Sequence, residues 1–294
     1  ARRINEANLK CEIVHSGRGE LARSSVVQNS SLIVAAEINE IGNHSGDVNV
    51  ILSKATAIKE EWLYELYPTE IKKGVQRYYF DQQMRRVMVE EETIFRGLCL
   101  NRVHKDAEPS DITDAILAEQ ILSGNLKLTD WDDSLEQWFM RVNFLAKWCP
   151  ELKIPEIGEK DKIGVLKRFC GNSISYKGIK DRFVKPLFYE LLTYEQHKAL
   201  ETYAPQRLKL SNGRTPKVIY VSSNMPYISL RIQELYDVMS VPKIAMGRVD
   251  VQVHILAPNM RPVQITSDLA GFWDKHYPTL KQQFQRLYPK HQWR

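Results

Sequence analysis

Long hydrophobic stretches are absent from this sequence of 294 residues. No apolar run approaches the ~20 residues that a bilayer-spanning helix needs, and the opening residues 1–6 do not lead into the apolar core of a signal peptide. We therefore predict a cytoplasmic protein with no membrane partner. Because the chain begins at Ala rather than Met, we expect it to be a piece of a longer polypeptide.

Cysteine is also scarce and unpatterned. The four cysteines are Cys11, Cys99, Cys149 and Cys170, and no two of them form a C-x-x-C pair. This spacing favours reduced, buried thiols over disulfides or a metal centre. The seven histidines are scattered without ligand spacing, so no metal site is predicted from them either.

The residue patterns of familiar catalytic sites are missing as well. The chain has no G-x-x-x-x-G-K-[ST] phosphate loop, no Asp-Glu-x-His box, no G-x-S-x-G elbow and no H-E-x-x-H pair. The nearest Gly/Lys runs, residues 171–178 and 213–217, lack the Gly-Lys-Ser/Thr core. We therefore predict no catalytic residue and no cofactor within this chain.

What the sequence does have is positive charge concentrated in one half. Residues 151–294 carry 23 lysines and arginines against 13 acidic residues, whereas residues 1–110 carry 15 against 16 and residues 111–150 carry 3 against 7. A basic half joined to a neutral-to-acidic half indicates a polyanionic partner for the basic part. The alternative is a solvated surface with a slight excess of lysine. At this length we expect two or three domains.

Residues 1–107 alternate short β-rich runs with turns and include one helical pattern. The predicted elements are strands at 11–15, 31–38, 48–52, 74–81 and 84–89, a turn at 42–47 and a helix at 59–66. This order fits an OB-like β-barrel, a fold that binds single strands through basic and aromatic side chains. The candidate binding residues are Arg18 on the first turn and Arg77, Tyr78, Arg85 and Arg86 around the closing hairpin. The open alternative is that Tyr78 or Tyr79 faces the core and the arginines only solvate a strand edge.

Helical spacing dominates residues 108–203, which we predict to be a helical connector. The predicted helices cover 111–122, 133–149, 161–169, 186–192 and 193–200. Trp131, Trp138 and Trp148 recur with other apolar residues at this spacing, and we predict that all three are core residues. Asp132 and Asp133 are predicted to be helix N-terminal charges rather than a catalytic pair.

Residues 204–294 mix strand and helix patterns and are predicted to form a small α/β C-terminal domain. Strands are expected at 247–256 and 261–265, followed by helices at 269–277 and 279–287. The candidate phosphate-binding residues here are Arg214, Arg248, Arg261, Arg286, Lys290, His291 and Arg294. Tyr288 and Trp293 could stack on unpaired bases or could pack the tail onto its own domain, and the sequence leaves both roles open.

The residue order of 247–294 resembles the C-terminal signature of HrpB-type bacterial ATP-dependent helicases, a branch of the DEAH-box family. The matching residues are Arg261-Pro262-Val263-Gln264, Thr266, Asp268-Leu269, Phe272-Trp273, Tyr277 and Tyr288-Pro289-Lys290-His291-Gln292-Trp293. Gln292 departs from the pattern, in which a proline is common at this position. The turn at residues 16–21 and the Val-Ala-Ala-Glu strand at 34–37 resemble the OB domain of the same family.

The resemblance implies that this chain is the non-motor part of an ATP-dependent RNA helicase. It implies an OB-like barrel at 1–107, a helical connector at 108–203 and an α/β C-terminal domain at 204–294. ATP and magnesium are then expected in an ATPase core outside this chain. The implied partners are single-stranded RNA, with DNA as the alternative, and the helicase core of the same polypeptide. The rival prediction is a scaffold that docks on the motor or on a protein partner without touching RNA.

Overall fold

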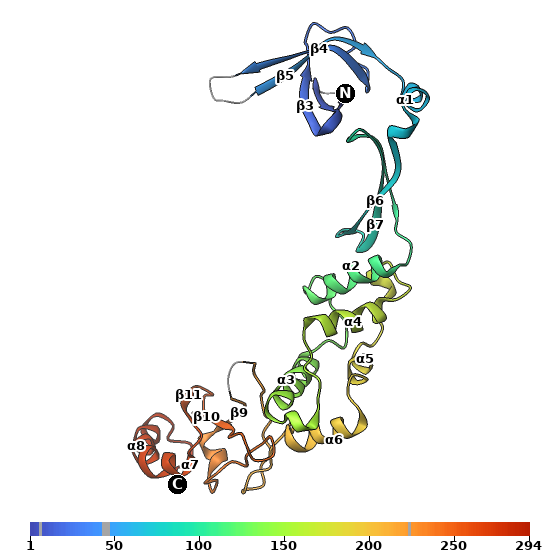
Figure 1. Ribbon diagram of the computed structural model, residues 1–294. Helices are drawn as coiled ribbons and strands as arrows, with labels where there is room; N and C mark the ends of the chain where they lie inside the picture. The colour runs from blue at the N-terminus through green and yellow to red at the C-terminus, as the bar shows by residue number, and fades with distance from the viewer. Residues whose placement is uncertain (6–7, 43–47, 223–224) are drawn as a thin grey trace. The chain divides into compact units, whose positions relative to one another are not determined.

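The computed structural model describes residues 1–5, 8–42, 48–222 and 225–294 (Figure 1). The chain is a mixed α/β protein with three sheets. It divides into two compact units: the first comprises Ala1–Leu117 and Gly171–Tyr176, and the second comprises Ala118–Cys170 and Lys177–Arg294. The three-domain division proposed from the sequence stays a prediction.

The first sheet of the first unit has five strands in the order β1-β2-β3-β5-β4. Their bounds are β1 (Arg2–Arg3), β2 (Lys10–Ile13), β3 (Gly17–Leu21), β4 (Ile33–Gly42) and β5 (Val48–Ala57). Neighbouring strands are antiparallel except β3 and β5, which are parallel. A fully buried cluster of Cys11, Leu21, Ile33 and Leu52 forms the core beneath this sheet. The turn predicted at 42–47 lies almost entirely outside the described residues.

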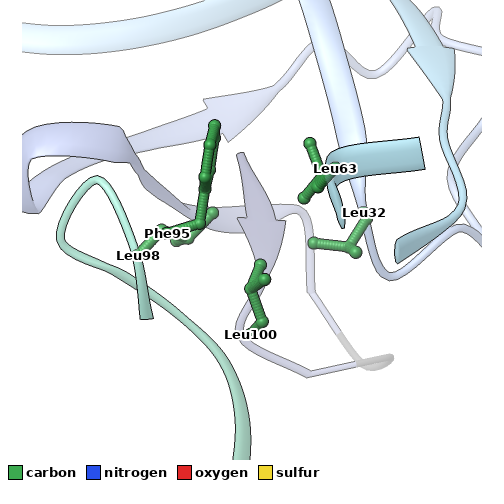
Figure 2. Close-up of a cluster of buried hydrophobic side chains, with 5 residues drawn as sticks. All are labelled: Leu32, Leu63, Phe95, Leu98 and Leu100. Carbon is green, nitrogen blue, oxygen red and sulfur yellow. The ribbon is translucent and has the colours of Figure 1, made fainter. Parts of the chain in front are cut away.

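Helix α1 (Glu60–Leu66) leads into the second sheet, whose strand order is β6-β7-β8. The strands are β6 (Ile71–Asp81), β7 (Arg86–Phe95) and β8 (Leu98–Asp106), and both pairings are antiparallel. Figure 2 shows the small core at one end of this sheet. It contains Leu32, Leu63, Phe95, Leu98 and Leu100, so α1 and the β7–β8 turn are held together by apolar burial.

The predicted closing hairpin belongs to this second sheet. The sequence placed strands 74–81 and 84–89 in an OB-like barrel with the earlier strands, but the structure pairs β6 with β7 and β7 with β8 in a separate sheet. Short turns let all three long strands satisfy their backbone groups locally. The described strands form no closed barrel, and the OB-like prediction is therefore not confirmed.

Helices make up most of the chain from 111 to 203. They are α2 (Asp111–Leu122), α3 (Asp133–Trp148), α4 (Glu159–Cys170), α5 (Lys185–Tyr189) and α6 (Tyr194–Tyr203). Each predicted helix of this region is therefore present. Asp132 caps α3, and Thr193 and Gln196 form a capping box on α6. The core prediction was wrong for Trp148, which is 41% exposed, whereas Trp138 is buried.

The last part of the chain holds the third sheet and the C-terminal helices (Figure 1). The strands β9 (Tyr227–Arg231) and β10 (Gln252–Leu256) are parallel, and β11 (Pro262–Thr266) is antiparallel to β10. Then follow α7 (Leu269–Gly271), a π-helical turn (Phe272–His276) and α8 (Tyr277–Leu287). The predicted strand at 247–256 is shorter than expected because it pairs regularly only from Gln252. Every described helix is too short or too polar to cross a lipid bilayer.

The remaining short segments are 3₁₀ turns at chain reversals. They are η1 (Val14–Ser16), η2 (Pro68–Glu70), η3 (Pro150–Leu152), η4 (Tyr176–Gly178) and η5 (Ile232–Leu235). The four cysteines are free thiols, and three of them are buried while Cys99 is partly exposed. The described residues contain no group of three potential metal ligands.

Candidate nucleic-acid interface

The β6–β7 hairpin carries four of the candidate residues. In the antiparallel register Arg77 lies opposite Glu90 and Tyr78 lies opposite Val89. The Tyr78 hydroxyl donates to Gln76 Oε1 at 2.9 Å, so its ring is tethered beside the strand. Arg85 sits in the turn with a left-handed φ of 51°, and its guanidinium lies 3.8 Å from the centre of the Tyr176 ring. Both tyrosines remain partly exposed.

Carboxylates on the same sheet pair with Arg86 of the hairpin and with Arg102 of β8. Arg86 Nη1 lies 2.6 Å from Asp106 Oδ2. On the central strand, Glu90 and Glu92 are only 13% and 19% exposed, and Arg102 reaches both, at 3.6 and 2.6 Å. The acidic run at 90–92 was not included in the sequence prediction. The alternation around Arg77 marked a strand in the sequence. Pairing this strand, β6, with β7 places these acids opposite the basic strand.

Arg18 belongs to a different sheet from the hairpin residues. It is an exposed residue of β3 and faces Glu12 of β2 across the first sheet. None of the contacts found among the described residues joins Arg18 to β6 or β7. The structure therefore does not assemble the five candidates of the first unit into one cluster.

Three of the candidate arginines in the second unit already have carboxylate partners. Arg214 pairs with Glu234 at 3.3 Å, Arg248 with Glu151 at 2.7 Å and Arg294 with Asp237 at 2.5 Å. The hydrogen bond from Arg248 holds the pKa of the Glu151 carboxyl below its ordinary value. The partners are 20 to 97 residues away in sequence, so charge counting along the chain could not reveal them.

The other basic candidates of this unit are exposed and form no ion pair among the described residues. Arg261 lies in the turn before β11, Arg286 in the last turn of α8, and Lys290 just beyond it. His291 is also exposed, with its ring 6.1 Å from that of Tyr288. The charges of Arg261, Arg286 and Lys290 are therefore available to a polyanion.

The aromatic residues of the tail pack against their own unit. The Trp293 ring lies 5.2 Å from Phe284, and the Trp293 indole N–H donates to the Tyr288 carbonyl at 3.2 Å. The Tyr236 hydroxyl shares a 2.9 Å hydrogen bond with Tyr277 and donates to the Gln292 carbonyl at 3.3 Å. The pKa of Tyr277 is raised, mainly by burial and secondly by the hydrogen bond with Tyr236. The packing favours the structural role for Tyr288 and Trp293 and leaves the neighbouring cations at the surface.

The chain is similar in sequence and in fold to a known helicase. Residues 165–294 match the family model described as the ATP-dependent helicase C-terminal domain, HrpB_C. The chain is 26% identical over 262 residues to the ATP-dependent RNA helicase HrpB of Escherichia coli (strain K12). The aligned region covers 86% of the chain and 31% of that protein. The chain is thus similar to the C-terminal region of HrpB-type helicases.

Two solved structures of E. coli HrpB share this fold. The crystal structure titled as the DExH-box NTPase HrpB matches all of the chain with a TM-score of 0.58 and 22% identity, over 36% of its own length. The one titled as the DEAH/RHA helicase HrpB matches 94% of the chain with a TM-score of 0.52 and 20% identity, over 34% of its length. The chain thus spans about a third of the length of the HrpB proteins it matches.

Proposed function

We propose that this chain guides single-stranded RNA for an ATPase core located elsewhere in the same polypeptide. The similarity to HrpB supports this proposal, because the relative is named an ATP-dependent RNA helicase. ATP and magnesium would act in that core, since the sequence here has no phosphate loop. The role left for these residues is to bind and orient the strand. DNA is the alternative strand chemistry.

The observation that carries the proposal is the set of exposed cations near the end of the second unit. Arg261, Arg286 and Lys290 have no ion-pair partner among the described residues. Binding a phosphate with such a group releases a condensed counterion and costs no broken salt bridge. Arg214, Arg248 and Arg294 can also contribute to phosphate binding, because their exposed ion pairs stabilise the fold by only ~0–1 kcal/mol and can be exchanged for phosphate contacts.

We retain the OB-like barrel as part of this proposal for the first unit. One feature supports it: β1 is bonded to the residues that begin β4. Arg2 and Leu32 form an antiparallel bridge, and the Ile33 N–H donates to the Ala1 carbonyl at 3.0 Å. These contacts bring the first strand of the sheet to its last, which is the geometry that a small barrel requires.

A salt titration of RNA binding tests the proposed function. We expect the full chain to bind a labelled oligouridylate at low salt, with an affinity that falls by ~0.7 log unit per log unit of salt for each phosphate neutralised. The Arg286→Glu/Lys290→Glu variant should bind more weakly, and the steepness of its salt dependence should drop by about 1.4. Fluorescence anisotropy measures both quantities.

The matched control is Arg168→Glu, because Arg168 is exposed but already pairs with Glu190 at 3.0 Å. It should change the affinity much less than the double variant. Binding that ignores salt, or no binding at 50 mM salt, would overturn the proposal. That result would favour the scaffold role, for which α1 offers the exposed apolar side chains of Trp62 and Leu66.

A further inference from the structure

We propose that a cavity beside α3 receives one unstacked base of the bound single strand. The cavity lies wholly within the second unit and has a volume of about 690 Å³, within the ~300–1,000 Å³ typical of small-molecule sites. This inference rests on the proposed function and adds a base-binding site to it. None of the candidate residues predicted from the sequence lines this cavity.

One wall of the cavity is a second face of α3. The first face is buried and includes Leu135, Trp138 and Val142. Met140 and Phe144 lie four residues apart, Lys147 and Trp148 lie three and four residues after Phe144, and all four line the cavity instead. A helix of 16 residues therefore packs its core on one side and borders a hollow on another. Ile154, Pro226 and Val249 also line the cavity and are buried.

Trp148 gives the cavity a surface on which a base can stack. Its side chain is 41% exposed, and no aromatic ring of the described residues stacks on it. An exposed indole is unfavourable in water, and the planar face of a nucleobase would cover it. All four bases have such a face, so the site should accept a strand with little regard to its sequence.

The polar groups of the cavity match the parts of a nucleotide. Lys147 is exposed and forms no ion pair among the described residues, so its ammonium group can meet a phosphate. Glu156 is also exposed at the cavity, where its carboxylate can accept from a ring N–H or exocyclic amine of the base. A purely apolar ligand would leave both charges without a partner.

Arg248 positions this wall rather than lining it. Its Nη1 donates to the Trp148 carbonyl at 2.8 Å, while Nη2 pairs with Glu151 at 2.7 Å. Arg248 thereby ties down the end of α3 at Trp148, 100 residues away in sequence, and Glu151, 97 residues away. Arg248 is a positioning residue in this arrangement, and its neighbour Val249 borders the cavity.

Comparing a base-bearing strand with an abasic strand tests the inference. The full chain should bind an oligouridylate at least about fivefold more tightly than an abasic oligomer of equal length and charge, since stacking contributes to only one of them. Trp148→Ala should remove most of that difference and leave abasic binding unchanged. Trp148→Phe should restore part of it. Trp62→Ala is the control, because Trp62 is similarly exposed, at 44%, but belongs to the first unit.

Photocrosslinking of a 4-thiouridine oligomer to the unaltered chain gives a test that needs no variant. The crosslinked peptide should include residues 140–156. Equal binding of both strands, or crosslinks confined to other segments, would overturn the base site while leaving the proposed function intact. Failure to bind either strand at low salt would overturn the proposed function and this inference together.

Discussion

Asp132 illustrates how single side chains hold the walls of the candidate site in place. Its Oδ1 accepts hydrogen bonds from the backbone N–H groups of Ser134 and Leu135 at 2.9 and 3.1 Å, which caps α3. Its Oδ2 lies 2.8 Å from Lys185 Nζ. The hydrogen bond from Lys185 is the main reason that the pKa of the Asp132 carboxyl lies well below its ordinary value. The Asp132 carboxylate thus both caps α3 and forms an ion pair with Lys185.

Removing this cap should destabilise the second unit at neutral pH. We expect Asp132→Ala to lower the free energy of unfolding by about 1 kcal/mol at pH 7, measured by urea denaturation. Because the folded pKa lies below the unfolded value of ~3.9, the stabilisation is present above about pH 4 and is lost as the pH falls towards the folded pKa. The difference between wild type and variant should therefore narrow below pH 4.

Asp133→Ala is the matched control, because Asp133 is an exposed carboxylate in the first turn of the same helix. It should cost less than about 0.5 kcal/mol, the scale of a helix-dipole contact. An equal loss in both variants would contradict the capping role of Asp132. The sequence correctly placed both carboxylates at a helix N-terminus, because that signal is local.

Trp148 shows where the same local reasoning ended. Helical spacing groups residues 145, 148 and 149 on neighbouring positions, but spacing alone does not show where the buried face ends. Leu145 and Cys149 are buried, whereas Trp148 is exposed at the cavity. Only the packing of segments remote in sequence separates the two environments, and the base site consequently had no sequence signal of its own.

At the scale of secondary-structure elements, the sheet of β6, β7 and β8 depends on ion pairs on one of its faces. Glu90 and Glu92 of the central strand have side chains that are mostly buried. Arg102 of β8 bridges both, and His104 Nε2 lies 3.7 Å from Glu90. The strand register fixes this arrangement, because Glu92 lies opposite Arg102 and Glu90 lies opposite His104.

We expect Arg102→Ala to lower the free energy of unfolding by about 1–2 kcal/mol, since it leaves two poorly solvated carboxylates without their shared cation. Lys105→Ala is the control: Lys105 pairs with Glu91 at 2.6 Å, but the two side chains are 52% and 35% exposed, so the loss of this pair should cost clearly less. Thermal and urea denaturation at pH 7 measure both effects. Similar losses for the two variants would show that the burial of Glu90 and Glu92 has no energetic role.

For this sheet, the positions of the strands were easier to predict than the pairing between them. Period-two alternation marked 74–81 and 84–89 as strands; the first lies within β6, and the second lies within β7 from Arg86 onward. Alternation does not say which sheet a strand joins, because that choice depends on remote contacts. A bulge between Lys72 and Val75, with Gly74 at a φ of 71°, adds a further irregularity that periodicity hides.

At the scale of the whole molecule, the charge counts correctly identified the basic half but not which of its cations are free. Arg248 and Arg294 meet acids that lie 97 and 57 residues away. Tertiary structure therefore divides the candidate cations of this half into paired and unpaired groups. The unpaired Arg261, Arg286 and Lys290 lie in the turn before β11, in α8 and just beyond α8. The electrostatic attraction for a polyanion should concentrate there, since paired charges cancel beyond about a Debye length of ~8–10 Å.

This division predicts where a bound strand should protect the backbone. In hydrogen–deuterium exchange of the full chain with an oligouridylate at low salt, we expect slower exchange in residues 140–156 and 259–294. We expect no change in 86–106, because Arg86 and Arg102 of this segment are already paired with Asp106, Glu90 and Glu92. Raising the salt to about 500 mM should abolish the protection, as counterion release requires. Protection confined to 86–106 would place the strand on the ion-paired sheet and would contradict the view that free cations, rather than total charge, decide where it binds.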